Sequence, residues 1–226
     1  MDNNFNDFRK FAVSSGIGSG LLDSYSKHGI QAAYINPTIL EERVLNVSQM
    51  DVFSRLMMDR QIFLGTPIND DVANIIAAQL LWLESQDPGK DVQLLVNSPG
   101  GSVSAGYAIV DTMDLIQNDV STTVIGMAAS MGAVIASNGV HGKRYILPHA
   151  RFMIHQPLGG VNGQASDIEI EANEIIKIKK ELYKTLEGNS KLSYDEIVKK
   201  ADRNCWLTAG EAVEYGFADS IINRNK

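Results

Sequence analysis

Ser130 lies in a segment where a strand is expected to turn into a helix. Residues 120–125 are rich in β-branched side chains, as strands are, and residues 131–137 are compact and apolar enough for a buried helix. In such a turn the hydroxyl projects at the C-terminal edge of the sheet, beside the first N–H groups of the helix, which can stabilise an oxyanion. An ordinary packed turn has the same small residues, so Ser130 is a candidate nucleophile that needs support from the rest of the chain.

An activated serine needs a base, and histidine is the usual one. Of the four histidines, three lie in segments that we expect to be turn-like or outside the sheet: His28, His141 and His149. His155 follows the apolar run 152–154 and is expected where a strand leaves the sheet. A histidine at a strand end is often structural, but next to Ser130 it is the best candidate for a general base.

A second unusual turn, Asn97-Ser-Pro-Gly-Gly-Ser102, follows a predicted buried strand at 92–96. Its two glycines allow backbone N–H groups to face a bound carbonyl or anion, although a plain tight turn has the same pattern. Ser98 and Ser102 are rival nucleophiles, but neither lies in an apolar, closely packed elbow. The sequence has no metal-ligand spacing and no phosphate loop, so we predict no metal and no other cofactor.

The composition is that of one globular domain of the α/β class. The chain has 226 residues, of which 44% are hydrophobic and 21% charged, and a net charge of -7, which argues against a nucleic-acid partner. The single Cys205 excludes a disulfide framework, and no apolar run is long enough to span a bilayer, so we expect a cytoplasmic protein with no membrane partner. We predict a mobile leader or removable propeptide over residues 1–33 and a single domain over 34–226.

Strands alternating with helices are expected to position these candidates. Hydrophobic periodicity predicts strands over 61–64, 92–96, 120–125, 143–147, 151–154 and 218–222. It predicts helices over 52–59, 70–85, 105–117 and 131–137, and a long helix from 166 to 188. Two short helices are expected after it, one from 193 through about 203 and one from 208 to before 216. Capping boxes are expected at Ser166, Ser193 and Thr208, each with a glutamate three residues later, and Gly188 is expected to end the long helix. This order indicates an α/β fold with crossover connections.

Three motifs occur together in one order: Ser98-Pro-Gly-Gly101, Gly126-Met-Ala-Ala-Ser-Met-Gly132 and Met153-Ile-His-Gln-Pro157. With the segments 163–170 and 209–216, they closely resemble the proteolytic subunits of the Clp protease family, over about residues 45–222. The resemblance implies a fold of stacked βαβ units, related to that of the crotonases, with a small head domain and a long handle helix. On this handle, residues 164 and 168–178 would form the contact between rings, and residues 157–160 would line the substrate groove.

The resemblance implies a serine endopeptidase that acts in ATP-dependent proteolysis and protein quality control. Its subunits would form two stacked seven-membered rings, a tetradecamer that is either homomeric or heteromeric, around an enclosed chamber. An AAA+ unfoldase ATPase of the ClpX, ClpA or ClpC type would feed in unfolded proteins, which would be cut to short peptides.

Several residues take roles by matching the family motifs. Ser130 would be the nucleophile and His155 the general base, and the N–H groups of Gly101 and Met131 would form the oxyanion hole. Asp202 and Arg203 match the residues that couple oligomer contact to the active site. The positions that match the docking pocket for the ATPase are Ile125, Tyr145 and Leu147, whereas the usual aromatic sites nearby are Gln93 and Leu95.

One position departs from the family pattern: the motif Asp-Arg-Asp is Asp202-Arg-Asn204 here, so that Asn204 replaces the acid of the triad. An aspartate holds the histidine tautomer and stabilises the imidazolium, whereas asparagine does the first only if its carbonyl faces the ring. In a trypsin-type triad this change lowers turnover about ten-thousand-fold. Asp202 is expected on a helix and pointing elsewhere, and Cys205 is interpreted as a packing residue.

Three functions remain open at this point. The first is a working ATP-dependent serine peptidase that uses Ser130, His155 and Asn204. The second is a catalytically weak or dormant ring subunit that acts structurally with an active paralogue. The third, a hydratase of the crotonase type, expects a CoA site and acidic catalysts that are not evident. Because Ser130 and His155 are both present, the peptidase is preferred.

Overall fold

The computed structural model describes residues 10, 13–14, 38–43 and 46–223. The predicted leader, residues 1–33, therefore lies outside the described residues except at three positions, and His28 lies outside them altogether. The first described strands, β1 (Thr38–Arg43) and β2 (Asn46–Asp51), form an antiparallel pair. Within the described part of the chain, no helix is both long and apolar enough to cross a membrane.

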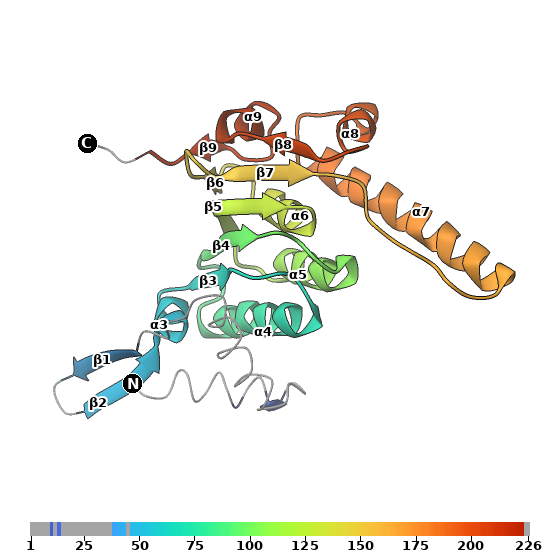
Figure 1. The fold of residues 1–226 in the computed structure, drawn as a ribbon. Coiled ribbons are helices and arrows are strands. Elements are labelled where there is room, and N and C mark those ends of the chain that lie inside the picture. The colour runs from blue at the N-terminus through green and yellow to red at the C-terminus, as the bar shows by residue number, and fades with distance from the viewer. Residues whose placement is uncertain (1–9, 11–12, 15–37, 44–45, 224–226) are drawn as a thin grey trace.

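The rest of the described chain is built on a mainly parallel sheet, as the alternation of strands and helices predicted (Figure 1). Its main path is β3-β4-β5-β6-β9, and β7 lies beside β5 and carries β8 as an antiparallel neighbour. The strands are β3 (Gln61–Leu64), β4 (Val92–Ser98), β5 (Val120–Ala129), β6 (Arg144–Ile146), β7 (Arg151–Ile154), β8 (Cys205–Leu207) and β9 (Ser220–Ile221).

Helices cover one side of this sheet and extend beyond it. The described helices are α3 (Val52–Met58), α4 (Asp70–Gln86), α5 (Val103–Leu115), α6 (Met131–Ser137), α7 (Ala165–Gly188), α8 (Tyr194–Lys200) and α9 (Ala209–Glu214). Helices α4, α5 and α6 lie beside one another along the sheet, and the side chains of Ile62, Leu94 and Ile146 are fully buried. The parallel strands end on the side from which α7 projects, so polar groups at the strand ends gather there (Figure 1).

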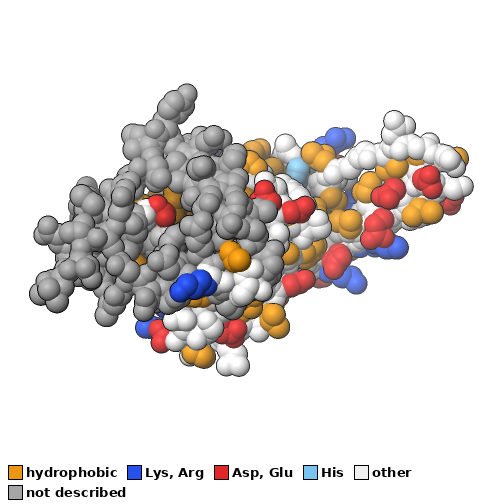
Figure 2. Space-filling model, turned by 90° about the horizontal axis from the view of Figure 1, so that it is seen from below, with side chains coloured by type: hydrophobic (Ala, Val, Ile, Leu, Met, Phe, Trp, Pro, Cys, Tyr) orange, Lys and Arg blue, Asp and Glu red, His pale blue; other side chains and the backbone are white. Residues whose placement is uncertain are grey.

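The two halves of α7 have different environments. Its C-terminal half is packed through Leu182, Tyr183 and Leu186, all buried. Its N-terminal half projects from the sheet, with Ile170 65% and Ile176 50% exposed. Figure 2 shows hydrophobic side chains between charged ones along this projecting part. Among the described residues, the chain itself therefore buries apolar side chains of this helix only in its C-terminal half.

Some predicted helix ends are confirmed and others are wrong. The capping boxes Ser193 with Glu196 and Thr208 with Glu211 are both present. The box at Ser166 is not formed, because α7 already begins at Ala165 and Ser166 lies inside the helix. Nor does Gly188 end the helix by a left-handed turn: it is the last helical residue, and Asn189 is the cap.

Candidate active site

Ser130 lies between β5 and α6 in a backbone conformation that L-residues rarely adopt. Its φ is 55° and its ψ is -123°, which is strained for any residue with a Cβ. The backbone is held there because the Ser130 N–H donates to the Met153 carbonyl at 2.9 Å, and because every residue of α6 is buried. The predicted turn from strand to helix is therefore present, with the serine at its tip.

Strand β5 runs four residues further than predicted, to Ala129, because an irregularity shifts its pairing with β4. Val96 pairs with Val124, but Ser98 pairs with Ala128, so β5 has two more residues than β4 between these pairs. Asn97 holds the extra residues, since its Oδ1 accepts the N–H of Met127 at 3.1 Å. The sequence placed Asn97 in the second turn but predicted no role for its side chain. The signal for that role was the glycine at 126, where a Cβ would lie 2.5 Å from the Asn97 Oδ1.

His155 and Ser130 meet at the ends of two neighbouring parallel strands. Ala129 pairs with Met153 in the β5–β7 ladder, so the two chains leave the sheet side by side. The Nε2 atom of His155 lies 2.8 Å from the Oγ atom of Ser130, a hydrogen-bond distance. Both side chains are partly buried. The geometry suits proton transfer from the hydroxyl to the ring.

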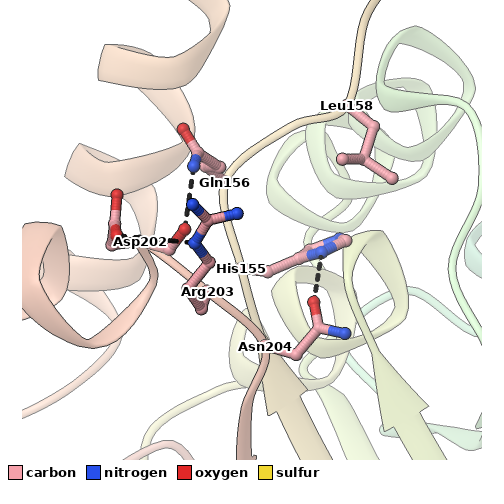
Figure 3. A pocket seen from close by; sticks show the side chains of 6 residues that line it. All are labelled: His155, Gln156, Leu158, Asp202, Arg203 and Asn204. Carbon is pink, nitrogen blue, oxygen red and sulfur yellow. Dashed lines mark hydrogen bonds and ion pairs between the residues drawn. The ribbon is translucent and has the colours of Figure 1, made fainter.

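Asn204 reaches the other side of the imidazole. Strand β8 pairs Cys205 with Ile154, so the residues just beyond this pair, Asn204 and His155, lie opposite each other. The Oδ1 atom of Asn204 lies 3.0 Å from Nδ1 of His155 (Figure 3). A carbonyl oxygen can only accept, so Nδ1 carries the proton and Nε2 is free to accept one from Ser130. The tautomer is the one that a serine–histidine pair needs.

Asp202 does not replace the missing acid. Helix α8 ends at Lys200, so the expectation of a helix through residue 203 is wrong and Asp202 lies in a turn. Its carboxylate lies 3.9 Å from the Nε of Arg203, and both side chains are exposed. Among the described residues, the hydrogen bonds of the His155 ring go to Ser130 and Asn204.

The two glycines of the turn at residues 97–102 allow this turn to pack closely against Ser130. At Gly100, with φ 92°, a Cβ would lie 2.7 Å from the Cβ of Ser130. At Gly101, with φ 156°, a Cβ would lie 2.1 Å from the carbonyl oxygen of Ile68, to which this turn is bridged. Both positions therefore require glycine, and the turn lies next to the candidate nucleophile.

The rival nucleophiles have other roles. Ser98 is fully buried, and its Oγ donates to the Thr66 carbonyl at 2.7 Å while accepting from the Gly100 N–H at 3.2 Å. Ser102 caps α5 by accepting from the Ala105 N–H at 3.4 Å. Burial raises the pKa of the Cys205 thiol, only partly countered by Lys200, so the thiolate form is disfavoured.

Two hollows adjoin the serine and the histidine. One lies beside Ser130 and is lined by apolar side chains: Val103, Met131, Val134, Ile154, Pro157, Leu182 and Leu186. The other, on the far side of His155, is lined by Gln156, Leu158, Asp202, Arg203 and Asn204 (Figure 3). The predicted groove segment thus contributes Pro157 to one hollow and Leu158, 87% exposed, to the other.

The residues matched to the ATPase pocket lie together on the partly exposed face of the sheet. Tyr145 pairs with Thr123, and the Leu147 N–H donates to Val124, which places Leu147 beside Ile125. All three predicted residues are half-buried. His141 and His149 are exposed and lie away from Ser130 in sequence, in the turns on either side of β6. No cluster of metal-binding side chains occurs in the described ranges.

Comparison with known proteins identifies the family of this chain. The family model for Clp protease matches residues 45–225. The ATP-dependent Clp protease proteolytic subunit of Porphyromonas gingivalis is 56% identical over 222 residues, 98% of this chain and 99% of the relative. The subunit of the same name from Bacteroides fragilis is 57% identical over 217 residues, 96% of this chain and 98% of the relative. The resemblance inferred from the motifs is thereby confirmed, and this chain belongs to the Clp protease family.

Proposed function

We propose that this chain is the proteolytic subunit of an ATP-dependent protease and cuts peptide bonds with Ser130 as nucleophile and His155 as general base. The observation that carries the assignment is the 2.8 Å contact between Ser130 Oγ and His155 Nε2. Membership of the Clp protease family supports the reaction class.

In the proposed reaction, His155 Nε2 takes the hydroxyl proton of Ser130 as Oγ attacks the peptide carbonyl carbon. The carbonyl oxygen becomes an oxyanion, and the C–N bond breaks as His155 returns the proton to the leaving amine. A water molecule then attacks the acyl-enzyme with His155 again as base, which releases the second peptide and restores the Ser130 hydroxyl.

The N–H groups of Gly101 and Met131 would stabilise the oxyanion. Met131 is the first residue of α6, so its N–H has no acceptor within the helix. The bridge to Ile68 uses the carbonyl of Gly100 and the N–H of Ser102, so the N–H of Gly101 points to the opposite side. Removing one such donor costs about a hundred- to a thousand-fold in turnover in other serine proteases.

Asn204 would hold the reactive tautomer but give no charge stabilisation. Its carbonyl accepts from Nδ1 of His155, as an aspartate would. A neutral amide, however, does not compensate the positive charge that forms on His155 during acyl transfer. We therefore expect a slow peptidase with its catalytic groups correctly placed.

Assembly and partners are proposed from the exposed surfaces. The uncovered half of α7, with Ile168 40% exposed, would be buried between two stacked heptameric rings, and Asp202 and Arg203 would couple this contact to the site. The half-buried face with Ile125, Tyr145 and Leu147 would receive loops of an AAA+ unfoldase in the cytoplasm. The apolar side chains beside Ser130 would contact those of an unfolded polypeptide substrate.

Covalent labelling tests the assignment. The purified protein is treated with a fluorophosphonate, which reacts with activated serines, and its intact mass is measured. We expect one adduct per chain, which maps to Ser130 and is absent in Ser130→Ala. The matched control is Ser102→Ala, at an exposed serine of the neighbouring turn, which should label like the wild type. A folded protein that does not label would contradict the proposal and favour a dormant ring subunit.

A further inference from the structure

Helix α7 is connected to the segment before Asn204 through the side chain of Gln156. The Nζ atom of Lys179 donates to Oε1 of Gln156 at 2.9 Å. The Nε2 atom of Gln156 donates in turn to the backbone carbonyl of Asp202 at 2.8 Å. A continuous chain of hydrogen bonds thus runs from the helix to a point two residues before Asn204. Figure 3 shows its second step, from Gln156 to Asp202.

The partners at both ends fix the orientation of the Gln156 amide. An ammonium group can only donate and a carbonyl oxygen can only accept, so the amide oxygen faces Lys179 and the amide nitrogen faces Asp202. A glutamate at position 156 would keep the contact with Lys179 but would lose the donor to Asp202. An apolar residue there would lose both.

The backbone carbonyl of Ala201, which precedes Asp202, is also held by α7 and by the residue at the end of β7. Ala201 accepts the backbone N–H of Gln156 at 2.7 Å and the hydroxyl of Tyr183, on α7, at 3.4 Å. Tyr183 is 1% exposed, and the Nζ of Lys179 lies 5.5 Å from the centre of its ring. The two carbonyls before the 203–204 segment are therefore fixed against α7 and the end of β7.

The side chain of Asn204 has little support of its own. It is exposed, and within the described residues its one side-chain hydrogen bond is the contact from Oδ1 to Nδ1 of His155. An aspartate has two equivalent oxygens, so either can accept from the ring. An asparagine has a single acceptor, and rotation by half a turn presents an NH₂ group that cannot accept.

We infer that Gln156 and Lys179 are positioning residues, which hold the Asn204 carbonyl toward His155 and matter more for asparagine than they would for aspartate. This inference rests on the proposed function, because it concerns the turnover of a serine peptidase. Neither side chain touches the reacting atoms; each acts through the backbone of Asp202.

The test begins with Lys179→Met, which removes the ammonium group and keeps the aliphatic stem. We expect kcat for a fluorogenic peptide to fall about tenfold with little change in KM, because a small misplacement of a catalytic group is costly. Lys179→Arg, which can still donate to Gln156, should restore most of the rate. The matched control is Lys180→Met, at the next residue of the helix. Its side chain is exposed and makes no hydrogen bond or ion pair within the described part of the chain.

The decisive measurement repeats Lys179→Met in the Asn204→Asp background. We expect the loss to shrink to less than about twofold, because the two substitutions are coupled through the same contact. An equal tenfold loss in both backgrounds would reduce Lys179 to a merely structural role and overturn the inference, as would a wild-type rate in Lys179→Met. If Lys179→Met does not assemble, Gln156→Glu makes the same comparison.

Failure of this inference can be told apart from failure of the proposed function. Rates are normalised to the Ser130 sites that react with a fluorophosphonate. If the wild type does not label, the proposed function fails; if it labels and turns over but Lys179 and Asn204 are not coupled, only the positioning inference fails.

Discussion

Two side-chain contacts tie the strand ends of this protein to its C-terminal segments, and they differ in charge. Arg144, on β6, is 3% exposed and donates to Asp219 from Nη2 at 2.7 Å and from Nε at 3.1 Å. His155, after β7, has the neutral and exposed Asn204 as its partner. The buried cation Arg144 thus has a carboxylate partner, which it needs for stability. His155 would become a cation only during the proposed reaction, and it has no carboxylate partner. The two contacts separate a requirement of folding from a requirement of turnover.

Exchanging the neutral partner for an acid should produce the largest effect. In Asn204→Asp the carboxylate would stabilise the imidazolium that forms on His155, so kcat should rise by about 10²- to 10⁴-fold, with KM little changed. Steady-state hydrolysis of a fluorogenic peptide measures the change, and Asn204→Asp combined with Ser130→Ala provides the background. An unchanged kcat would mean that assembly or alignment limits the wild type instead.

The reverse exchange, Asp219→Asn, should affect stability. It leaves the buried Arg144 without its counter-charge, although Nη1 still donates to the Asn189 carbonyl at 2.6 Å. We expect the free energy of unfolding to fall by about 3 kcal/mol, the usual cost of removing one partner of a buried ion pair. Denaturant unfolding measures this. Lys90→Met, which removes an exposed ion pair with Asp87, is the control and should change stability by less than about 1 kcal/mol.

Acidification should remove the difference in the free energy of unfolding between the wild type and Asp219→Asn. Burial raises the pKa of Asp219, but the hydrogen bonds and charge of Arg144 and the N–H of Gly142 lower it more, so the pKa lies below its ordinary value. In the unfolded chain this carboxyl has a pKa of about 3.9. The stabilisation that Asp219 gives the folded state is therefore complete above that pH, and it is lost as the pH falls through the lower pKa of the folded state. Unfolding at a series of pH values should show a constant gap above about pH 5 that narrows below about pH 4. A gap that stays constant throughout this range would rule out the assigned carboxylate.

The elements of the fold could be predicted because their signals are local. Helix α4 and strand β3 lie where their hydrophobic periodicity placed them, and Ser193 and Thr208 begin helices through contacts only three residues long. The motifs also brought Ser130, His155 and Asn204 to attention before the structure placed them in contact.

The missed features depend on contacts between distant residues. Asn97 meets Met127, thirty positions away, and Lys179 meets Gln156 twenty-three positions away, so neither contact leaves a periodic trace in the sequence. Ser166 and Glu169 have the residue types and spacing of a capping box, but the helix already begins at Ala165. That start shows how a local pattern is overridden by its surroundings.

Strand β5 has neighbours on both edges, and each edge fixes a different part of the site. On one edge it pairs with β7, which sets the distance from Ser130 to His155. On the other it pairs with β4 through the irregularity at Asn97, which sets the distance from Ser130 to the Gly101 turn. In the proposed mechanism, turnover would therefore require two independent alignments. A sliding of β4 along β5 would disturb only the second, and the subunit would then keep a well-formed serine–histidine pair without the proposed oxyanion hole.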